Sequence, residues 1–207
     1  VLNYLLLLGW APEGEQEIFS LDEMIKIWDP SRISKSPAIF DPLKLRAINA
    51  AYIRALPAEE FRKLADPFID QAVHVQIDRD LLCANLQPRC EVLEDIPPQL
   101  DFFDAVLPID AEMYRNKKQK TTPESAKEAL SALLPVLEAQ TDWSRDAIFE
   151  ACKQKAEAME KKNGWLLFPL GIALSGKART PGGGTDLAAM MGREETLKRV
   201  KDALGKL

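Results

Sequence analysis

Signals that start helices recur along the whole chain, and they limit its fold more than any other feature. Ser20-Leu-Asp-Glu23 is a capping box, in which the serine caps a helix and Glu23 bonds back to it. Asp41 with Pro42 forms an N-cap and first-turn proline, and Asp78 is a further N-cap. Apolar residues follow at spacings of three and four, as in amphipathic helices. Strand patterns are nearly absent, so the sequence predicts an all-α fold of two helical bundles joined near residue 75.

Glycine and proline set the expected helix boundaries near the end of the chain. We expect helices over residues 145–162, 169–174 and 194–204, with Asn163-Gly164 ending the first of them. Thr185 is the predicted N-cap of a short helix that Gly192 ends.

The composition is typical of a folded globular protein. The chain has 207 residues, of which 46% are apolar and 29% are charged. Three widely spaced cysteines without a CxxC pair predict reduced, mostly buried thiols in a cytosolic protein: Cys83, Cys90 and Cys152. The net charge is −5, but residues 78–112 hold nine acids and two bases, whereas residues 113–127 hold five bases and one acid. Local patches therefore decide where a phosphate backbone could bind.

The apolar start of the chain resembles the core of a signal peptide, but it lacks a basic segment and an initiator Met. We interpret residues 1–10 as the last turns of a buried helix and expect the chain to begin inside a longer protein. No apolar run approaches the roughly 20 residues of a membrane span, so no membrane partner is expected.

Two stretches suit ligand recognition without being catalytic. Residues 41–54 form an amphipathic helix that ends in Arg54, and residues 168–184 form an apolar segment that runs into a basic loop rich in glycine. Such a loop lets backbone groups approach a ligand closely. Unstacked RNA bases need hydrogen-bond donors and flat surfaces, and nearby basic side chains add contacts to phosphates. The two stretches therefore favour recognition of a single-stranded RNA loop.

Three motifs that are typical of enzymes are incomplete in this sequence. Gly171–Ala178 nearly matches the phosphate loop GxxxxGK[ST], but Ala178 replaces the magnesium-binding hydroxyl and no strand precedes it. Arg32–Ser36 mimics the KMSKS loop of class I aminoacyl-tRNA synthetases, but it lies between two capped helices, so we interpret it as a structural connection. His74 has no partner at metal-ligand spacing. We expect no catalytic, cofactor or metal site in this chain.

Short motifs occur in a specific order along nearly the whole chain. They are Asn3-Tyr-Leu, Leu8-Gly-Trp10, Phe19-Ser-Leu, Ser34-Lys-Ser-Pro-Ala-Ile-Phe-Asp41, Lys44-Leu, Asn49 with Tyr52-Ile-Arg54, Asn116-Lys-Lys118, and Pro169-Leu with Ala173-Leu-Ser-Gly176. Together they resemble the C-terminal half of bacterial glutamyl-tRNA synthetases, which are class I aminoacyl-tRNA synthetases.

The resemblance implies that this chain is the part of such an enzyme that binds the anticodon. Residues 1–18 would be the tail of the stem-contact region, and residues 19–74 and 75–207 would be two helical anticodon-binding subdomains. The full-length enzyme would be a cytoplasmic monomer that attaches glutamate to tRNA(Glu) with ATP and Mg²⁺. The fragment itself would be catalytically silent and hold no cofactor.

The resemblance also implies contacts to the anticodon. Arg54 matches an arginine that faces the last anticodon base, where its planar group can bond a base edge and stack on a ring. Thr180 and Pro181 match a base-contacting loop, and Lys153 aligns with a further basic contact.

Two positions depart from the family pattern. Gly171 stands where the family has a base-contacting arginine, and Gly183 stands where an apolar residue would flank a base. Lys177 and Arg179 are the candidates to substitute for the lost side chains.

Three alternatives stay open. Gly171 favours a synthetase that glutamylates tRNA(Gln) as well as, or instead of, tRNA(Glu). A helical protein-interaction module without RNA binding would expose the stripe of Phe61 and Phe68. Arg54 could also be a surface or cap residue that only stabilises the helix, because cations interact favourably with the dipole at the last helical turn.

Overall fold

The computed structural model describes residues 1–35 and 37–207, and it confirms the predicted all-α class. The helices are α1 Leu2–Gly9, α2 Leu21–Ile27, α3 Pro42–Ala55, α4 Ala58–Ile69, α5 Arg79–Leu86, α6 Pro123–Ala139, α7 Arg145–Ala158, α8 Asn163–Ser175 and α9 Gly184–Lys206. Short 3-10 turns are η1 Pro30–Arg32, η2 Gln87–Arg89, η3 Leu93–Asp95, η4 Pro97–Gln99 and η5 Ala111–Tyr114. The described residues form no strand, only isolated bridges from Trp10 to Ile33 and from Asn116 to Thr121. None of the helices in this described part is long and apolar enough to span a membrane.

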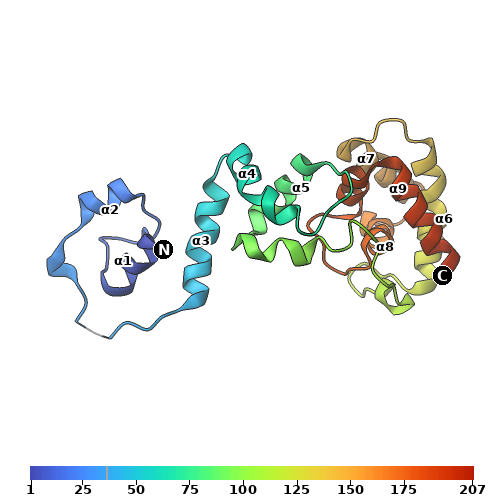
Figure 1. The fold of residues 1–207 in the computed structure, drawn as a ribbon. Coiled ribbons are helices and arrows are strands. Elements are labelled where there is room, and N and C mark those ends of the chain that lie inside the picture. Colours follow the sequence, from blue (N-terminus) through green and yellow to red (C-terminus); the bar gives the residue numbers. More distant parts are fainter. Residues whose placement is uncertain (36) are drawn as a thin grey trace.

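The helices follow one another along an extended molecule (Figure 1). Helices α1 and α2 lie at one end, next to α3. The middle of the molecule contains α4 and α5, and the bundle of α6 to α9 forms the other end. The N-terminus and the C-terminus therefore lie at opposite ends of the fold.

Apolar burial holds the C-terminal bundle together. The central helix α8 has a mostly apolar sequence and packs against α6, α7 and α9. The same core continues through α5 and α4 to Ile53 in α3. It therefore crosses residue 75 without a break, and the division into subdomains at that residue stays a prediction.

Side-chain hydrogen bonds hold the N-terminal helices together. The Asn3 amide donates to the carbonyl of Glu17 at 2.7 Å and accepts from the backbone N–H of Phe19 at 2.9 Å. The Tyr52 hydroxyl lies 2.6 Å from the carbonyl oxygen of Phe19 and 2.9 Å from Asn3 Oδ1. The Tyr4 hydroxyl accepts the N–H of Asp41 at 2.7 Å. Several residues of the short sequence motifs thus connect the N-terminal helices through hydrogen bonds.

The predicted caps of the first helices are confirmed. Ser20 and Glu23 bond reciprocally, the Asp41 carboxylate accepts two backbone N–H groups at the start of α3, and Asp78 caps α5.

The boundaries of the later helices were predicted wrongly. Helix α7 ends at Ala158, because the next turn unwinds and Glu160 adopts a φ of 54°. Helix α8 begins at Asn163 and continues through Pro169, although a proline removes one helical hydrogen bond. Burial of most of the helix outweighs that loss, and this burial is a tertiary effect. Gly183, and not Thr185, is the N-cap of α9, whereas the predicted break at Gly192 is confirmed by its φ of 79°.

Candidate nucleic-acid interface

One groove gathers most of the predicted RNA contacts. It has a volume of about 550 Å³, and residues of η2, α7, α8, the loop after α8 and the start of α9 line it. The predicted residues that line it are Gly171, Lys177, Arg179, Thr180 and Gly183. Arg54, Lys153 and Pro181 are not among the lining residues.

The loop beside the groove is fixed where it leaves α8. Gly176 ends the helix with a φ of 70°, and a Cβ there would lie 2.6 Å from the carbonyl oxygen of Leu107. Only glycine fits that position. The Ser175 hydroxyl donates to the carbonyl of Gly171 at 2.7 Å and accepts the N–H of Lys177 at 3.0 Å. The Ser-Gly pair therefore sets the direction in which the basic loop leaves the helix.

The other end of the loop is fixed against α7 and α8. A Cβ at Gly184 would lie 2.7 Å from the carbonyl oxygen of Leu167, so the start of α9 approaches α8 closely. The Asp186 carboxylate accepts the N–H of Gly183 at 2.7 Å and pairs with Arg145 Nε at 3.0 Å. The loop is thereby held at both ends.

An arginine and two aromatic rings give the groove flat surfaces. The Arg145 guanidinium lies 5.3 Å from the ring centroid of Phe149, and half-buried Phe168 lines the groove from α8. Sequence reasoning did not name Arg145 and Phe149, and it included Phe168 only as the first residue of the recognition stretch 168–184. The spacing of four between Arg145 and Phe149 at the start of a helix was the only available signal, because such residues share one helix face.

The two basic residues of the loop differ in their partners. The Lys177 ammonium pairs with the Asp101 carboxylate, donates to the carbonyl of Pro98 at 2.8 Å and lies 6.0 Å from the Phe102 ring. Arg179 is exposed and makes no hydrogen bond or ion pair with the described residues. Arg179 can therefore meet a ligand without losing a contact, whereas Lys177 anchors the loop.

The remaining predicted residues of the loop face different surroundings. The Thr180 hydroxyl donates to the carbonyl of Gly182 at 2.6 Å, and Pro181 is buried. Gly183 is exposed at the groove. A Cβ at Gly171 would meet only the backbone of Gly184 at 3.8 Å, so a side chain can begin there without a clash and would start at the groove.

The two predicted residues on other helices lie outside the groove lining. Lys153 follows Phe149 by one turn on α7 and pairs with Glu150 at 3.3 Å. Arg54 lies exposed in the last turn of α3, and its side chain has no partner among the described residues.

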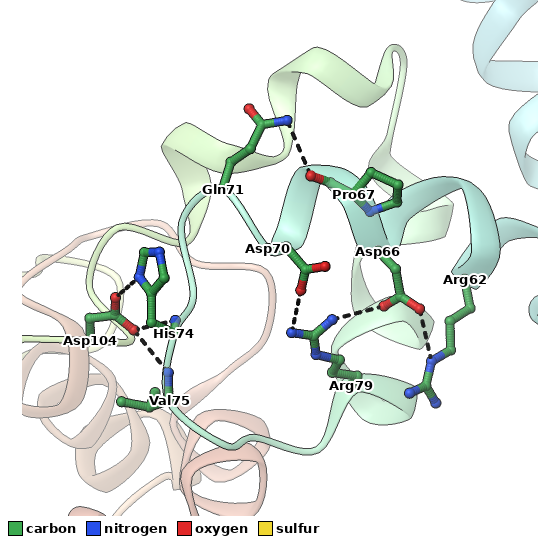
Figure 2. A network of polar contacts seen from close by, with 9 residues as sticks. All are labelled: Arg62, Asp66, Pro67, Asp70, Gln71, His74, Val75, Arg79 and Asp104. Carbon is green, nitrogen blue, oxygen red and sulfur yellow. Dashed lines mark hydrogen bonds and ion pairs between the residues drawn. The ribbon is translucent and has the colours of Figure 1, made fainter.

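The connection between α4 and α5 is tightly held (Figure 2). Arg79 pairs with Asp70 at 2.6 Å and with Asp66 at 3.2 Å. Asp104 accepts the backbone N–H of His74 at 2.7 Å and also pairs with its ring, and these bonds lower the pKa of the Asp104 carboxyl. His74 thus has a structural partner at the predicted subdomain boundary.

The residues of the incomplete enzyme motifs belong to a helix or to a loop held by local contacts. Residues 171–175 belong to helix α8, so the phosphate-loop geometry does not form there. Arg32 pairs with Glu13 at 2.9 Å and lies 5.5 Å from the Trp10 ring centroid, as expected of a structural connection. Ser36, the last residue of that motif, lies outside the described residues.

All three predicted buried thiols are confirmed as free and buried. Burial raises the pKa of Cys152 to about 12 and that of Cys83 and Cys90 to about 11.

Comparisons with a protein family and with curated relatives agree with each other. The family described as "Anticodon binding domain" matches residues 49–204. A glutamate–tRNA ligase of Clostridium botulinum (strain Hall) is 44% identical over the whole chain, which covers 43% of that protein. The ligase of Clostridium acetobutylicum is 43% identical, with the same coverage. The chain thus spans less than half the length of these curated relatives.

Solved structures agree with this match. A glutamate tRNA ligase from Elizabethkingia meningosepticum, solved in complex with its amino acid, superposes with a TM-score of 0.85 at 27% identity. The match covers 100% of this chain and 40% of that one. The glutamate–tRNA synthetase of Elizabethkingia anophelis gives a TM-score of 0.78 at 26% identity, covering 99% of this chain and 40% of its own.

Proposed function

This chain belongs to the anticodon binding domain family, and from that membership we propose that it recognises the anticodon of tRNA(Glu) as part of a glutamate–tRNA ligase. The groove between α7, α8 and the loop after α8 supports the proposal most strongly. It combines an unpaired arginine, a stacked arginine and phenylalanine, and exposed loop backbone. These are the groups that bind unstacked RNA bases.

The proposal extends to the ligase of which this chain would be a part. That enzyme attaches glutamate to tRNA(Glu) in the cytoplasm and acts as a monomer. ATP and Mg²⁺ serve the part of the ligase that lies outside this chain, and we propose no site for either in residues 1–207. Residues 19–74 and 75–207 act as two anticodon-binding subdomains, after the stem-contact tail of residues 1–18.

Binding of tRNA(Glu) to this chain tests the proposal. We expect salt-dependent binding in a fluorescence titration, because basic side chains release counterions from phosphates. Replacing Arg54 by alanine should weaken binding by about 1–3 kcal/mol if it bonds a base edge through both of its terminal nitrogens. Arg193→Ala is the control, since that exposed guanidinium, unlike that of Arg54, already donates to the carbonyl of Glu138 and is not among the predicted RNA contacts. Absence of binding by the unaltered chain would contradict the proposal.

A second candidate function is recognition of tRNA(Gln). Gly171 motivates it, because the groove is open at a position that could hold a larger side chain. Titration with tRNA(Glu) and tRNA(Gln) carrying exchanged anticodons separates the two candidates. Affinity that follows the glutamine anticodon would favour the second candidate, and affinity that follows the glutamate anticodon would reject it.

The protein-interaction module is the less favoured alternative. Phe61 is fully buried and Phe68 packs half-buried against the core, so this stripe is not displayed for a partner. A chain that showed no salt-dependent RNA binding would revive this alternative.

A further inference from the structure

Three arginine side chains have no partner among the residues that the structure describes. They are Arg54, Arg89 and Arg179, and every other arginine of the chain makes a hydrogen bond or an ion pair. All three are exposed. The sequence and the family resemblance point to Arg54 and Arg179 as RNA contacts, but not to Arg89.

Arg89 lies between the other two arginines in the fold. It lines the same groove as Arg179. It also ends the 3-10 turn η2, which packs against α3, the helix that carries Arg54. The rise of a 3-10 helix is about 2 Å per residue, so Arg89 is only about 4 Å along the turn axis from Gln87.

Gln87 ties this turn to the helix end beside Arg54. Its amide nitrogen donates to the carbonyl of Ile53 at 3.0 Å and to the carbonyl of Leu56 at 2.8 Å. These carbonyls belong to the residue before Arg54 and to the C-cap of α3. The Ile53 carbonyl also accepts the N–H of Leu56 at 3.3 Å, whereas carbonyls beyond the helix end have no helical donor. Gln87 therefore adds two contacts that help to hold the last turn of α3 in place.

The acidic character of the surrounding segment is partly offset near Arg89. The nearest acids along the chain after Arg89 are Glu91, Glu94 and Asp95, and the carboxylates of Glu91 and Asp95 pair with Arg46 of α3. Their negative charge is thus partly neutralised. The pairs also hold η3 and the residue Glu91 before it against α3, where Asn49 donates to the carbonyl of Glu91 at 2.6 Å.

We infer that the turn Gln87–Arg89 joins the two halves of the RNA interface. Arg89 binds a phosphate of the strand that runs between Arg54 and the groove, and Gln87 is a positioning residue for Arg54. The inference rests on the proposed function, and it adds a contact on a segment whose net charge is negative.

Titration with an anticodon stem-loop of tRNA(Glu) tests the role of Arg89. Arg89→Gln should lower the affinity about tenfold and reduce the slope of log K against log salt by about 0.7, the value for one phosphate contact to a single strand. Arg89→Lys should keep most of the affinity, because the charge remains. Arg193→Gln is the matched control, because it removes one exposed charge outside the groove lining and should change neither quantity comparably.

The possible outcomes separate the inference from the proposed function. If the unaltered chain binds the stem-loop and Arg89→Gln binds equally well with the same salt slope, the inference is wrong and the proposed function stands. If the unaltered chain does not bind, the proposed function fails first. Equal losses in Arg89→Gln and Arg193→Gln would show a general charge effect and overturn the assignment to Arg89.

A double-mutant cycle tests the role of Gln87. Gln87→Ala should weaken binding about threefold to tenfold when Arg54 is present, and by less than about twofold in an Arg54→Ala background. A purely structural loss would weaken binding by the same factor in both backgrounds, and that result would overturn the positioning role. Circular dichroism and the thermal midpoint of each variant confirm that the chain is folded during the titration.

Discussion

Residues 1–55 and the bundle of α6 to α9 differ in how their buried groups are held. In the bundle, apolar side chains such as Leu130, Leu133 and Leu137 are completely buried. In the N-terminal part, Leu2 and Leu5 stay 62% and 53% exposed. There the Asn3 side chain accepts the N–H of Phe19 and the Tyr52 hydroxyl donates to the carbonyl of Phe19, and these bonds connect the helices. Buried apolar area is the main favourable contribution to folding, so the bundle should be the more stable region.

Removal of the buried guanidinium of Arg199 should have the largest effect on this comparison. Arg199 is 3% exposed and donates to the carbonyls of Phe102, Phe103 and Leu174 at 2.6–2.7 Å. Arg199→Met leaves these buried carbonyls without this donor and removes one of the two cationic partners of Glu195. It should lower the free energy of unfolding by about 3–5 kcal/mol in a urea titration.

An exposed arginine provides the control for this experiment. Arg115 pairs with Glu112 on the surface, so Arg115→Met should cost less than about 1 kcal/mol. A similar loss of unfolding free energy in both variants would mean that the buried hydrogen bonds of Arg199 stabilise the bundle no more than a surface ion pair does.

Removal of the Tyr52 hydroxyl should have a smaller and local effect. Tyr52→Phe leaves the carbonyl of Phe19 without this donor, which costs about 1–2 kcal/mol. Hydrogen exchange should accelerate in α1 and α2, while amides of α6 to α9 keep their protection. Equal acceleration in both regions would show that the chain unfolds as one unit, and would remove the distinction between them.

Protonation of Glu195 at low pH should have the smallest effect on the free energy of unfolding. Burial acts to raise the pKa of Glu195, but hydrogen bonds from Arg199 and Lys198 outweigh it and hold the pKa below its usual value of 4.5. The unfolded chain then binds the proton more readily, so this stabilisation is complete above about pH 4.5 and is lost as the pH falls through the lower pKa of the folded state.

The side chain of Glu195 is about one-third exposed, so its contribution should be less than about 1 kcal/mol. The free energy of unfolding of Glu195→Gln should depend less on pH below 4.5 than that of the unaltered chain. An unchanged pH dependence would exclude Glu195 as a source of acid sensitivity in the bundle.

Local signals in the sequence carried the predictions that the structure confirms. The reciprocal bonds of Ser20 and Glu23 join residues three apart, and Asp41 and Asp78 cap helices through N–H groups two or three positions away. Gly192 breaks α9 for an equally local reason, its positive φ. The expected boundary at Pro169 was wrong, because burial of α8 by three other helices outweighs the preference of one residue.

The candidate interface could be outlined from the sequence only in part, for a related reason. The basic loop is continuous in sequence, so Lys177 and Arg179 could be named as candidate contacts before the fold was known, and their role stays a prediction. The sequence could not show that Lys177 is held by Asp101, or that Arg89 lines the groove beside Arg179.

The sequence by itself determined that this chain is helical, where most of its helices begin, and which family it resembles. The tertiary structure alone decided which arginine side chains are free. Arg46 and Arg199 are bound by partners distant in sequence, whereas Arg54, Arg89 and Arg179 have no partner within residues 1–35 and 37–207. Caps and turns depend on neighbours within a few residues, so the order of residues specifies them. The availability of a charge depends on groups that only packing brings together, and the surface that we propose for RNA binding is therefore a property of the folded chain.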